Sequence, residues 1–332
     1  MRTFDYDSNY CSKKTINIGG INVYVYNTES LSEYIANYNK TIEGPHEGHE
    51  KFLQLPLNVL YFIHYRGGSY MNTEAFGYRT LQYIHENKGD TKVPAIFVTF
   101  DLRNHGERTL DEERNKSWSS GNETHGLDMV SAIEGNIADI KLIMDYLPAY
   151  LNLEAQLNDK AKNILETKLE YRNFLSGYSL GGHTVIRFAA KFPELVRTIN
   201  TVVGCPDLSS LLITRLRKIS LNDSAYDKKW FYHEYNELNL TDEEKQKYPE
   251  HFHNYLKQQD IDVFEHFKFA KIPMYACFGT EDSLTPPKLS KAWVEIYENT
   301  NEYSESFFQK SIGHECTEEM LKGYASWIIK FL

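Results

Sequence analysis

The sequence predicts an α/β fold in which a mostly parallel sheet of about eight strands is covered by helices on both faces. Short, almost continuously apolar runs alternate with helix-like segments along most of the 332-residue chain, a pattern typical of parallel strands buried on both sides. The composition is 41% hydrophobic and 14% aromatic, which is enough for one large core. A glycine-rich turn over 177–182 lies between a predicted strand and a predicted helix.

The individual elements follow from apolar periodicity and from the glycines and prolines at the breaks. Strand-like runs occupy residues 15–18, 21–26, 57–63, 95–100, 173–175, 198–203, 274–278 and 306–309. Helix-like runs occupy residues 75–86, 127–147, 185–191 and 318–331. Gly19-Gly20 indicates a hairpin between the first two strands, and the long helix 127–147 is expected to close near Pro148. Residues 153–171 are charged and helical in composition, so we expect them to extend a helix ahead of strand 173–175.

The polar stretch 28–54 interrupts the alternation near the start of the chain. We interpret it as a surface loop with one helical piece near 31–38. His46 and His49 in this stretch could form a metal pair, but solvated loop histidines are the favoured interpretation.

A second interruption, 207–269, is aromatic and charged, with helical runs predicted over 208–219, 228–236 and 243–257. We interpret 207–269 as a helical cap inserted into an α/β core formed by 1–206 and 270–332, and placed over the C-terminal edge of the sheet. We expect most of its aromatic residues to pack against the core and a few to line a substrate cavity; they are Tyr226, Trp230, Phe231, Tyr232 and Tyr235.

Charge and cysteine content narrow the class of protein. The net charge is −10 and no basic stripe indicates nucleic-acid binding. No apolar run approaches the roughly 20 residues of a membrane span, and the N-terminus lacks the apolar core of a secretory signal, so a cytoplasmic location is expected by default. The four cysteines show no C-x-x-C spacing; we therefore expect neither a zinc site nor a disulfide framework. The oligomeric state is left open.

The turn Gly177-Tyr178-Ser179-Leu180-Gly181-Gly182 has the pattern G-x-S-x-G. Strings of glycine and serine are common in turns, so the match alone could arise by chance. Its place between a strand and a helix favours a nucleophile elbow, a sharp turn that exposes Ser179 at the positive end of the helix. The flanking glycines allow the strand and the helix to approach without a Cβ clash.

A serine hydroxyl needs a base to accept its proton and an acid to orient that base. His314 follows the last predicted strand, directly after Gly313. Asp282 follows strand 274–278 in a loop that Pro286 and Pro287 stiffen, and Glu281 is the rival acid. The chain order Ser179, Asp282, His314 is the order expected for such an elbow, so we predict these three as catalytic residues.

The same chemistry needs donors for an oxyanion, which can lower the barrier by roughly 3–4 kcal/mol. The N–H of Leu180, directly after Ser179, is the first predicted donor. The second is expected from the loop after strand 57–63, where the N–H of Arg66 is our choice and that of Tyr65 the alternative. His64 is expected to hold this loop in place.

Other polar residues invite a catalytic interpretation that we consider weaker. His105 lies in the loop 101–108, whose Asp and Arg side chains are expected to brace the backbone beside the elbow by charge-assisted hydrogen bonds. His183 is expected to pack behind the elbow. The next loop and the cap of the long helix are expected to involve Trp118, Gly121, Asn122, His125 and Asp128.

With Gly177–Gly182, the Asp282 loop and Gly313-His314 in place, the chain resembles the α/β-hydrolase superfamily over nearly all of its length. Residues 101–106 and 118–129 are similar to a group of poorly characterised fungal members, related to the prolyl-oligopeptidase-like and small esterase branches. The resemblance implies an eight-stranded, mostly parallel sheet, a Ser-His-Asp triad and no cofactor. It leaves the substrate open, because this fold hosts many chemistries.

These residues favour a serine hydrolase that acts on a small-molecule carboxylic ester or thioester through an acyl-enzyme. An acyltransferase or a peptidase with the same triad is the alternative within enzymes. A catalytically silent scaffold is the alternative outside them, and the presence of Ser179, Asp282 and His314 argues against it.

Overall fold

The sheet is the centre of the computed structural model, which describes residues 4–43, 53–88, 93–219 and 229–332. Eight strands form one sheet in the order β1-β2-β4-β3-β5-β6-β7-β8. Their bounds are β1 Lys13–Ile18, β2 Ile21–Tyr26, β3 Gln54–Ile63, β4 Ala95–Phe100, β5 Lys168–Tyr178, β6 Thr198–Val202, β7 Met274–Gly279 and β8 Glu305–Gln309. All neighbours are parallel except that β2 runs antiparallel to both β1 and β4. The predicted mostly parallel sheet is confirmed.

The predicted hairpin at Gly19-Gly20 joins β1 and β2. Both glycines have positive φ, 57° and 84°, a conformation that glycine adopts without the steric cost of a Cβ atom. The pairing of Ile18 with Ile21 fixes the register directly beside this turn.

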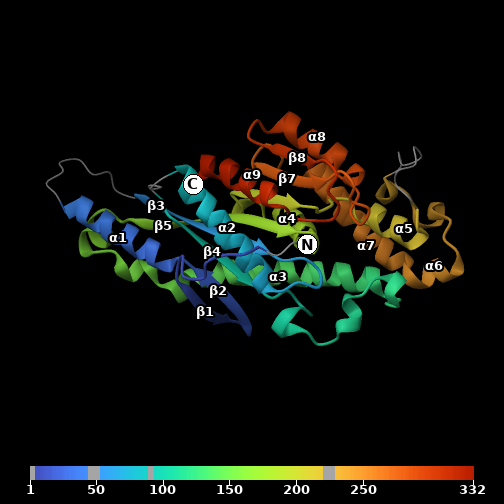
Figure 1. Cartoon of the computed structure of the whole chain (residues 1–332), viewed down its shortest axis with the longest axis horizontal. Coiled ribbons are helices and arrows are strands. Elements are labelled where there is room, and N and C mark those ends of the chain that lie inside the picture. Colours follow the sequence, from blue (N-terminus) through green and yellow to red (C-terminus); the bar gives the residue numbers. More distant parts are fainter. Residues whose placement is uncertain (1–3, 44–52, 89–92, 220–228) are drawn as a thin grey trace.

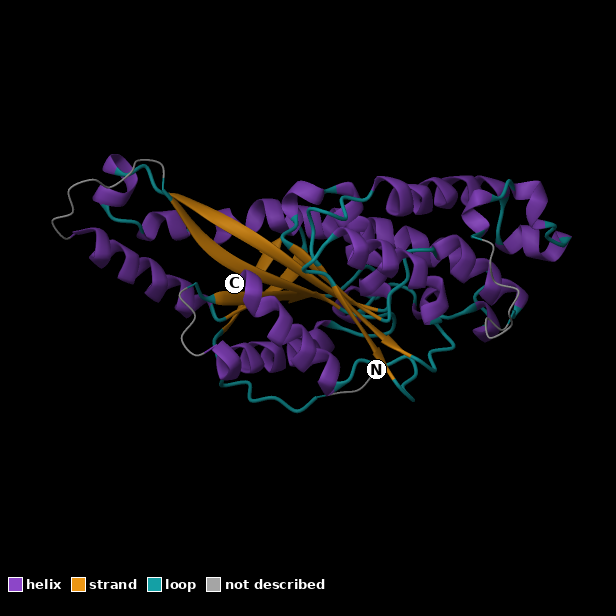
Figure 2. Ribbon diagram, turned by 90° about the horizontal axis from the view of Figure 1, so that it is seen from above, coloured by secondary structure: helices purple, strands orange, loops and turns teal. Residues whose placement is uncertain are grey.

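Helices cover both faces of the sheet, as Figure 2 shows. Their bounds are α1 Thr28–Glu43, α2 Tyr70–Lys88, α3 His125–Leu151, α4 Leu180–Lys191, α5 Leu208–Arg217, α6 Asp242–Lys247, α7 Glu250–Ile261, α8 Lys291–Thr300 and α9 Glu318–Ile328. Buried side chains of α2 and α9 share one hydrophobic cluster with the sheet, and those of α1, α3, α4 and α8 share the other. The order of strands and helices along the chain is visible in Figure 1.

Successive side chains of a strand point to opposite faces of the sheet, so one strand contributes to both hydrophobic clusters. Val59, Tyr61 and Ile63 of β3 face one side, while Leu60 and Phe62 face the other. Full burial of such side chains stabilises the fold by about 1.5–3 kcal/mol each.

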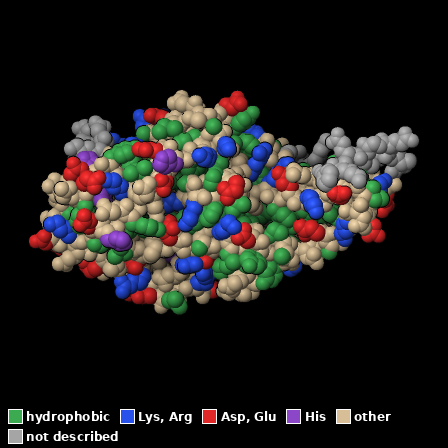
Figure 3. Space-filling model, turned by 180° about the vertical axis from the view of Figure 1, so that it is seen from behind, with side chains coloured by type: hydrophobic (Ala, Val, Ile, Leu, Met, Phe, Trp, Pro, Cys, Tyr) green, Lys and Arg blue, Asp and Glu red, His purple; other side chains and the backbone are tan. Residues whose placement is uncertain are grey.

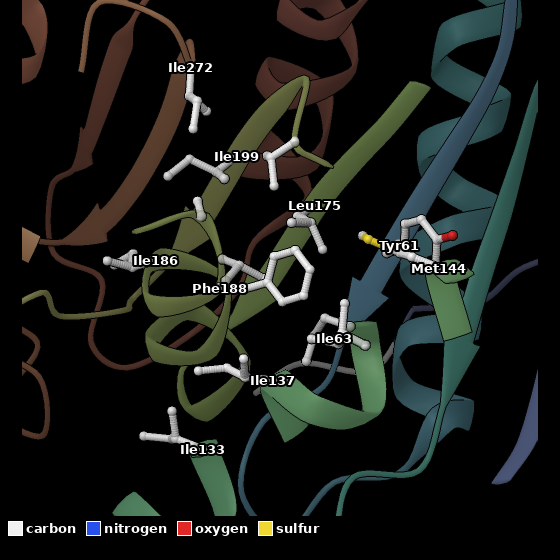
Figure 4. Close-up of a cluster of buried hydrophobic side chains, with 14 of the residues drawn as sticks. Tyr61, Ile63, Ile133, Ile137, Met144, Leu175, Ile186, Phe188, Ile199 and Ile272 are labelled. Carbon is white, nitrogen blue, oxygen red and sulfur yellow. The ribbon is translucent and has the colours of Figure 1, made fainter. Parts of the chain in front are cut away.

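On the α3–α4 side, the helices meet the sheet through aliphatic and aromatic groups (Figure 4). Ile137 of α3, Phe188 of α4 and Leu175 of β5 lie close together there, and all three are at most 2% exposed. This cluster anchors α4, the helix that begins directly after Ser179.

Two expectations about the middle of the chain are wrong. The helix α3 runs past Pro148 to Leu151 and ends at Asn152, whose left-handed φ of 48° breaks it and whose N–H bonds to the Pro148 carbonyl at 2.9 Å. Residues 153–171 do not extend a helix. They form two short helical turns, Leu153–Gln156 and Lys160–Ile164, and then the first part of β5.

The length of β5 explains the second error. It pairs with β3 along ten residues, from Gln54 opposite Lys168 to Ile63 opposite Gly177. Backbone pairing with a neighbouring strand overrides the helical composition of a charged segment, because strand preference depends strongly on context.

Other departures concern helix bounds. The helix α1 is longer than the piece expected near 31–38, and α8, which buries Trp293 and Tyr297, was not predicted. Residues 229–238 form short turns at Trp230–Tyr232 and Tyr235–Leu238 in place of the helix expected over 228–236. Pro249 separates α6 from α7, so the single helical run expected over 243–257 is two helices.

The segment interpreted as a cap contributes α5, α6 and α7, which lie together at one end of the molecule (Figure 1). Phe231 is fully buried, and the hydroxyl of Tyr235 donates to the Tyr248 carbonyl at 2.9 Å. These two aromatic groups contact residues of the same segment, since the Phe231 ring also packs on Phe264. The division into a core of 1–206 and 270–332 and a cap of 207–269 stays a prediction. His46, His49 and Tyr226 lie outside the described residues.

The molecular surface is mixed in charge. On the face shown in Figure 3, basic and acidic side chains of the described residues are interspersed. Within the described ranges, the helices are all too short or too polar to cross a bilayer.

Candidate active site

Ser179 occupies a strained turn between β5 and α4. Its φ is 52° and its ψ −108°, an unfavourable region for a residue with a side chain, which costs of the order of 1–3 kcal/mol. Its N–H donates to the Val202 carbonyl at 2.9 Å, which ties the turn to β6. The strand–turn–helix context predicted for an elbow is present.

Two glycines make this turn possible through close approach. A Cβ atom on Gly181 would lie 2.1 Å from the Ile63 carbonyl oxygen at the end of β3. A Cβ atom on Gly177 would lie 2.1 Å from the Gly181 carbonyl oxygen. Any larger residue would therefore push α4 away from β3 and from the loop that follows β3.

Three predicted residues from distant parts of the sequence form one hydrogen-bonded chain. His314 Nε2 lies 2.7 Å from Ser179 Oγ, and His314 Nδ1 lies 2.8 Å from Asp282 Oδ2. The side chain of Asp282 is 1% exposed and that of His314 18% exposed. The rival acid, Glu281, is exposed, and its N–H donates to the Ile312 carbonyl at 2.9 Å.

The Asp282 loop fixes the orientation of this chain. The other carboxylate oxygen, Oδ1, accepts the N–H groups of Leu284 at 2.9 Å and Thr285 at 2.8 Å. An ionised carboxylate has acceptors only, so Nδ1 of His314 carries the proton in this contact and Nε2 faces Ser179 with a lone pair. In this arrangement the imidazole can take the hydroxyl proton.

The predicted oxyanion donors border the same cavity. A cavity of about 180 Å³ is lined by Ser179, Leu180, His314, Tyr65 and Arg66, among others. Leu180 is the first residue of α4, where N–H groups lack partners inside the helix. Among the described residues, the N–H groups of Tyr65 and Arg66 donate no hydrogen bond. Either can therefore serve as the second donor.

His64 holds the loop that carries Tyr65 and Arg66. The N–H of Leu102 donates to His64 Nε2 at 3.0 Å, so Nδ1 carries the proton and donates to the Tyr65 carbonyl at 2.8 Å. Burial lowers the pKa of His64 to about 3, so the ring stays neutral. It links the loop after β3 to the loop after β4.

The loop after β4 is braced as expected. The guanidinium of Arg103 donates to both oxygens of Asp139, at 3.1 and 2.8 Å, and Arg108 donates to the same carboxylate at 2.9 Å. Asp101 accepts the N–H groups of Tyr70 and Glu107. The contacts of His105 Nδ1 are with the Arg103 carbonyl, away from Ser179.

The following loop is built around Asn122, whose amide donates to two carbonyls and to Asp128. Asp128 also accepts the hydroxyl of Thr124, the residue before α3. His125, the first residue of α3, lies with Nδ1 3.0 Å from Arg66 Nη1. Burial beside Arg66 and Arg215 lowers the pKa of His125 to about 3, so it faces these arginines as a neutral ring.

His183 packs behind Ser179. The N–H of Cys205 donates to its Nδ1 at 2.9 Å, and burial holds its pKa well below the usual value. The ring also borders the 180 Å³ cavity, a position that packing alone did not predict.

Sequence reasoning missed three further residues that line this cavity: Met129, Arg215 and Leu284. Arg215 lies on α5 among leucines and isoleucine. Arg217 lies two residues further along the same helix, so the sequence offered no signal that set Arg215 apart. Its Nε and Nη2 donate to the Leu284 carbonyl at 3.2 and 2.7 Å, and Nη1 lies 3.7 Å from the Met129 sulfur.

Two larger cavities adjoin the first. One of about 570 Å³ shares Arg66, Arg215 and Leu284 with it and extends to Trp118 and α6. Another of about 770 Å³ shares Arg215 and Leu284 and reaches Asp282. The part of the chain that the structure describes contains no cluster of side chains suited to hold a metal ion.

Comparisons with known proteins give structural neighbours only. No family model matches the sequence, and no curated protein matches it. TT1662 from Thermus thermophilus has 13% identity and a TM-score of 0.49, with 96% of each chain covered. An esterase from the archaeon Pyrobaculum calidifontis has 14% identity and a TM-score of 0.46, covering 98% of this chain and 86% of that one. Est1E from Butyrivibrio proteoclasticus has 12% identity and a TM-score of 0.48, covering 96% and 98%.

The topology itself is more informative. An eight-stranded sheet has one antiparallel strand, β2, inside an otherwise parallel order that continues to β8. A serine elbow joins its strand β5 to a helix at the sheet centre. The narrower similarity to a fungal group stays a prediction. The chain has the α/β-hydrolase fold.

Proposed function

We propose that this protein is a serine hydrolase that cleaves carboxylic esters or thioesters through an acyl-enzyme. The observation that carries the proposal is the continuous hydrogen-bonded chain from Ser179 through His314 to Asp282, at 2.7 and 2.8 Å. It begins at a strained elbow and borders a cavity whose backbone N–H groups at Tyr65 and Arg66 have no acceptor among the described residues.

The first half of the reaction uses these groups in order. Ser179 Oγ attacks the ester carbonyl while its proton moves to His314 Nε2, and Asp282 stabilises the imidazolium that forms. The carbonyl oxygen becomes an oxyanion, which the N–H of Leu180 and the N–H of Arg66 or Tyr65 stabilise. His314 then donates the proton to the leaving alcohol or thiol, and the acyl group remains on Ser179.

The second half repeats these steps with water. His314 takes a proton from water, the hydroxide attacks the acyl carbonyl, and the oxyanion forms again beside the same N–H groups. When it collapses, Oγ of Ser179 leaves with the proton from His314 and the carboxylic acid is released.

The test combines covalent labelling with turnover. A fluorophosphonate probe should label the protein, and 4-nitrophenyl butyrate should give a burst of nitrophenol. Ser179→Ala should abolish the labelling and lower kcat by at least about 10⁴-fold, and Asp282→Asn should lower it by about 10⁴-fold because it favours the wrong tautomer of His314.

The matched control is Ser131→Ala, which changes an exposed serine on α3. It should keep full labelling and turnover. Labelling that survives in Ser179→Ala would show that another residue reacts. Ester synthesis that exceeds hydrolysis when an alcohol acceptor is supplied would assign the same residues to an acyltransferase.

A further inference from the structure

Two arginines border the cavity at Ser179 from separate elements. Arg66 comes from the loop after β3 and Arg215 from α5. They also border the adjoining 570 Å³ cavity, so their side chains lie where the two cavities meet. A substrate group that passes from one cavity to the other contacts both.

Neither arginine has an acidic partner within the described part of the chain. Arg66 Nη1 lies 3.0 Å from Nδ1 of the neutral His125 ring, and this Nδ1 also lies 3.0 Å from the Lys116 carbonyl. Arg215 donates to the Leu284 carbonyl and approaches the Met129 sulfur. By contrast, seven other described arginines each have a carboxylate oxygen within 3.6 Å: Arg79, Arg103, Arg108, Arg114, Arg172, Arg187 and Arg217.

Both guanidinium groups stay charged at neutral pH. Burial lowers the pKa of Arg215 to about 10, with a smaller contribution from the charge of Arg66, and burial also lowers the pKa of Arg66. Two half-buried positive charges near each other repel, and each has lost part of its hydration. An anion between them would relieve both effects.

The nearest acid cannot act as this anion. Asp282 borders the adjoining 770 Å³ cavity, and its charge acts on Arg215, but its Oδ2 binds His314 and its Oδ1 accepts the N–H groups of Leu284 and Thr285. The 570 Å³ cavity is also lined by Lys218 and Lys247 and by two glutamates, Glu243 and Glu244. Both glutamates have a cation of their own, since Glu243 lies 2.8 Å from Lys247 and Glu244 lies 3.6 Å from Arg217.

We propose that Arg66 and Arg215 bind an anionic group of the substrate, so that the preferred ester carries a carboxylate or a phosphate close to the scissile bond. The planar guanidinium fork matches both groups and binds them bidentately. This inference rests on the proposed function, because it names the substrate class of the site at Ser179. The overall charge of −10 does not prevent it, since salt screens distant surface charges within about 10 Å.

The first experiment measures binding and does not depend on turnover. The wild-type protein is titrated by calorimetry with benzoate, phenylphosphonate and the neutral analogue benzamide. We expect at least one anion to bind at least tenfold more tightly than benzamide, and the tighter anion distinguishes a carboxylate from a phosphate substrate. Arg215→Met should remove this preference, and Arg215→Lys should keep part of it because the charge remains.

The matched control is Arg197→Met, which removes an equal charge at an exposed position before β6. It should keep the preference. Thermal melting of each variant separates a lost ligand contact from misfolding, and Arg66→Met tests the second arginine independently. Equal affinity for benzamide and both anions would overturn the inference, as would a preference that survives in both Arg215→Met and Arg66→Met.

The second experiment measures specificity. Hydrolysis of 4-carboxyphenyl butyrate is compared with that of phenyl butyrate, and we expect kcat/KM to be at least tenfold higher for the charged ester. In Arg215→Met the ratio of the two kcat/KM values should fall at least tenfold, mainly through KM for the charged ester.

The two proposals can fail separately. Hydrolysis that depends on Ser179 but shows no anion preference would overturn the substrate class and leave the hydrolase. Anion binding that depends on Arg215, in a protein that neither labels nor hydrolyses esters, would overturn the hydrolase and support the anion site.

Discussion

Two arginines, Arg187 on α4 and Arg215 on α5, differ in the partners of their charged groups. Arg187, on α4, is 3% exposed and bonds to the fully buried Asp260. Arg215, on α5, faces the cavity at Ser179 and has only a carbonyl and a thioether as partners among the described residues. The first cation therefore has its counter-charge within the chain, through Nη2, while its Nε and Nη1 are buried without a hydrogen-bond partner among the described residues. The second cation has no carboxylate at ion-pair distance in the described ranges, and the charge of Asp282 acts on it only from farther away.

This difference separates a structural role from a binding role. Asp260 also accepts the N–H groups of Leu208 and Ser209 at the start of α5, so the Arg187 pair ties α4, α5 and α7 together. A buried cation without an acid costs stability. Proteins retain such costs mainly where function requires them, and this is the case we propose for Arg215.

The largest change in stability is expected when Arg187 is removed from its ion pair with Asp260. Arg187→Met should lower the free energy of unfolding by about 3–5 kcal/mol, because it leaves Asp260 buried without its cation. Urea denaturation measures the change, and Arg187→Lys, which keeps the charge, should lose less. A loss under about 1 kcal/mol would show that the Arg187 pair does not have the structural role that sets it apart from Arg215.

A second carboxylate, Asp207, makes this region sensitive to pH. Burial and the negative charge of Asp260 raise the pKa of Asp207 to about 7. The folded state then holds a proton that the unfolded state has lost, so stability should fall as pH rises from about 4 to about 7. Asp207→Asn should remove this slope and gain on the order of 2 kcal/mol at pH 8.

The amide oxygen that Asp207→Asn introduces can still accept the Ser210 N–H, a bond that caps α5 in the native protein. The control is Asp242→Asn, because the Asp242 side chain is 99% exposed; it should keep the native slope. Urea denaturation at several pH values gives both curves. An unchanged slope in Asp207→Asn would mean that another group titrates.

Replacement of Arg215 should affect stability in the opposite way to replacement of Arg187. Arg215→Met should change the free energy of unfolding by less than about 1 kcal/mol, or increase it, because the lost hydrogen bonds to Leu284 are offset by the removal of a desolvated charge. Thermal and urea melts of the ligand-free protein test this. A loss comparable to that of Arg187→Met would assign Arg215 a structural role.

The smallest effect is expected at an exposed pair. Hydrogen bonds from Tyr83 and Arg79 lower the pKa of Glu318 to about 2, but its side chain is 42% exposed and solvent screens the interaction. Its contribution should be present above about pH 4.5 and lost as pH falls toward 2. Glu318→Gln should cost less than about 1 kcal/mol at pH 7, measured by urea denaturation.

Much of the fold was predictable because local signals and tertiary structure agree. The apolar runs at β3, β4 and β7 are buried throughout most of their length, and Gly19-Gly20 adopts the positive φ values of a tight hairpin. The contact among Ser179, Asp282 and His314 was predicted because parallel strands bring their carboxyl ends to one edge. Each of the three follows such an end.

The sequence-based expectations fail where tertiary contacts determine the secondary structure or the surroundings of a residue. Residues 168–171 are charged and helical in composition but pair with β3. Arg215 could not be identified because its exposure and the absence of an acid among the described residues depend on how α5 lies against the loops at Leu284 and Arg66. No spacing in the sequence records that arrangement.

The backbone angles of Ser179 have a consequence for how the protein can change over time. A glycine at position 179 would relieve the torsional cost of the turn, so the folded state would gain by giving up its hydroxyl. At this position, stability alone would therefore favour a substitution that removes the hydroxyl. Persistence of a serine there requires continual selection for what its oxygen does.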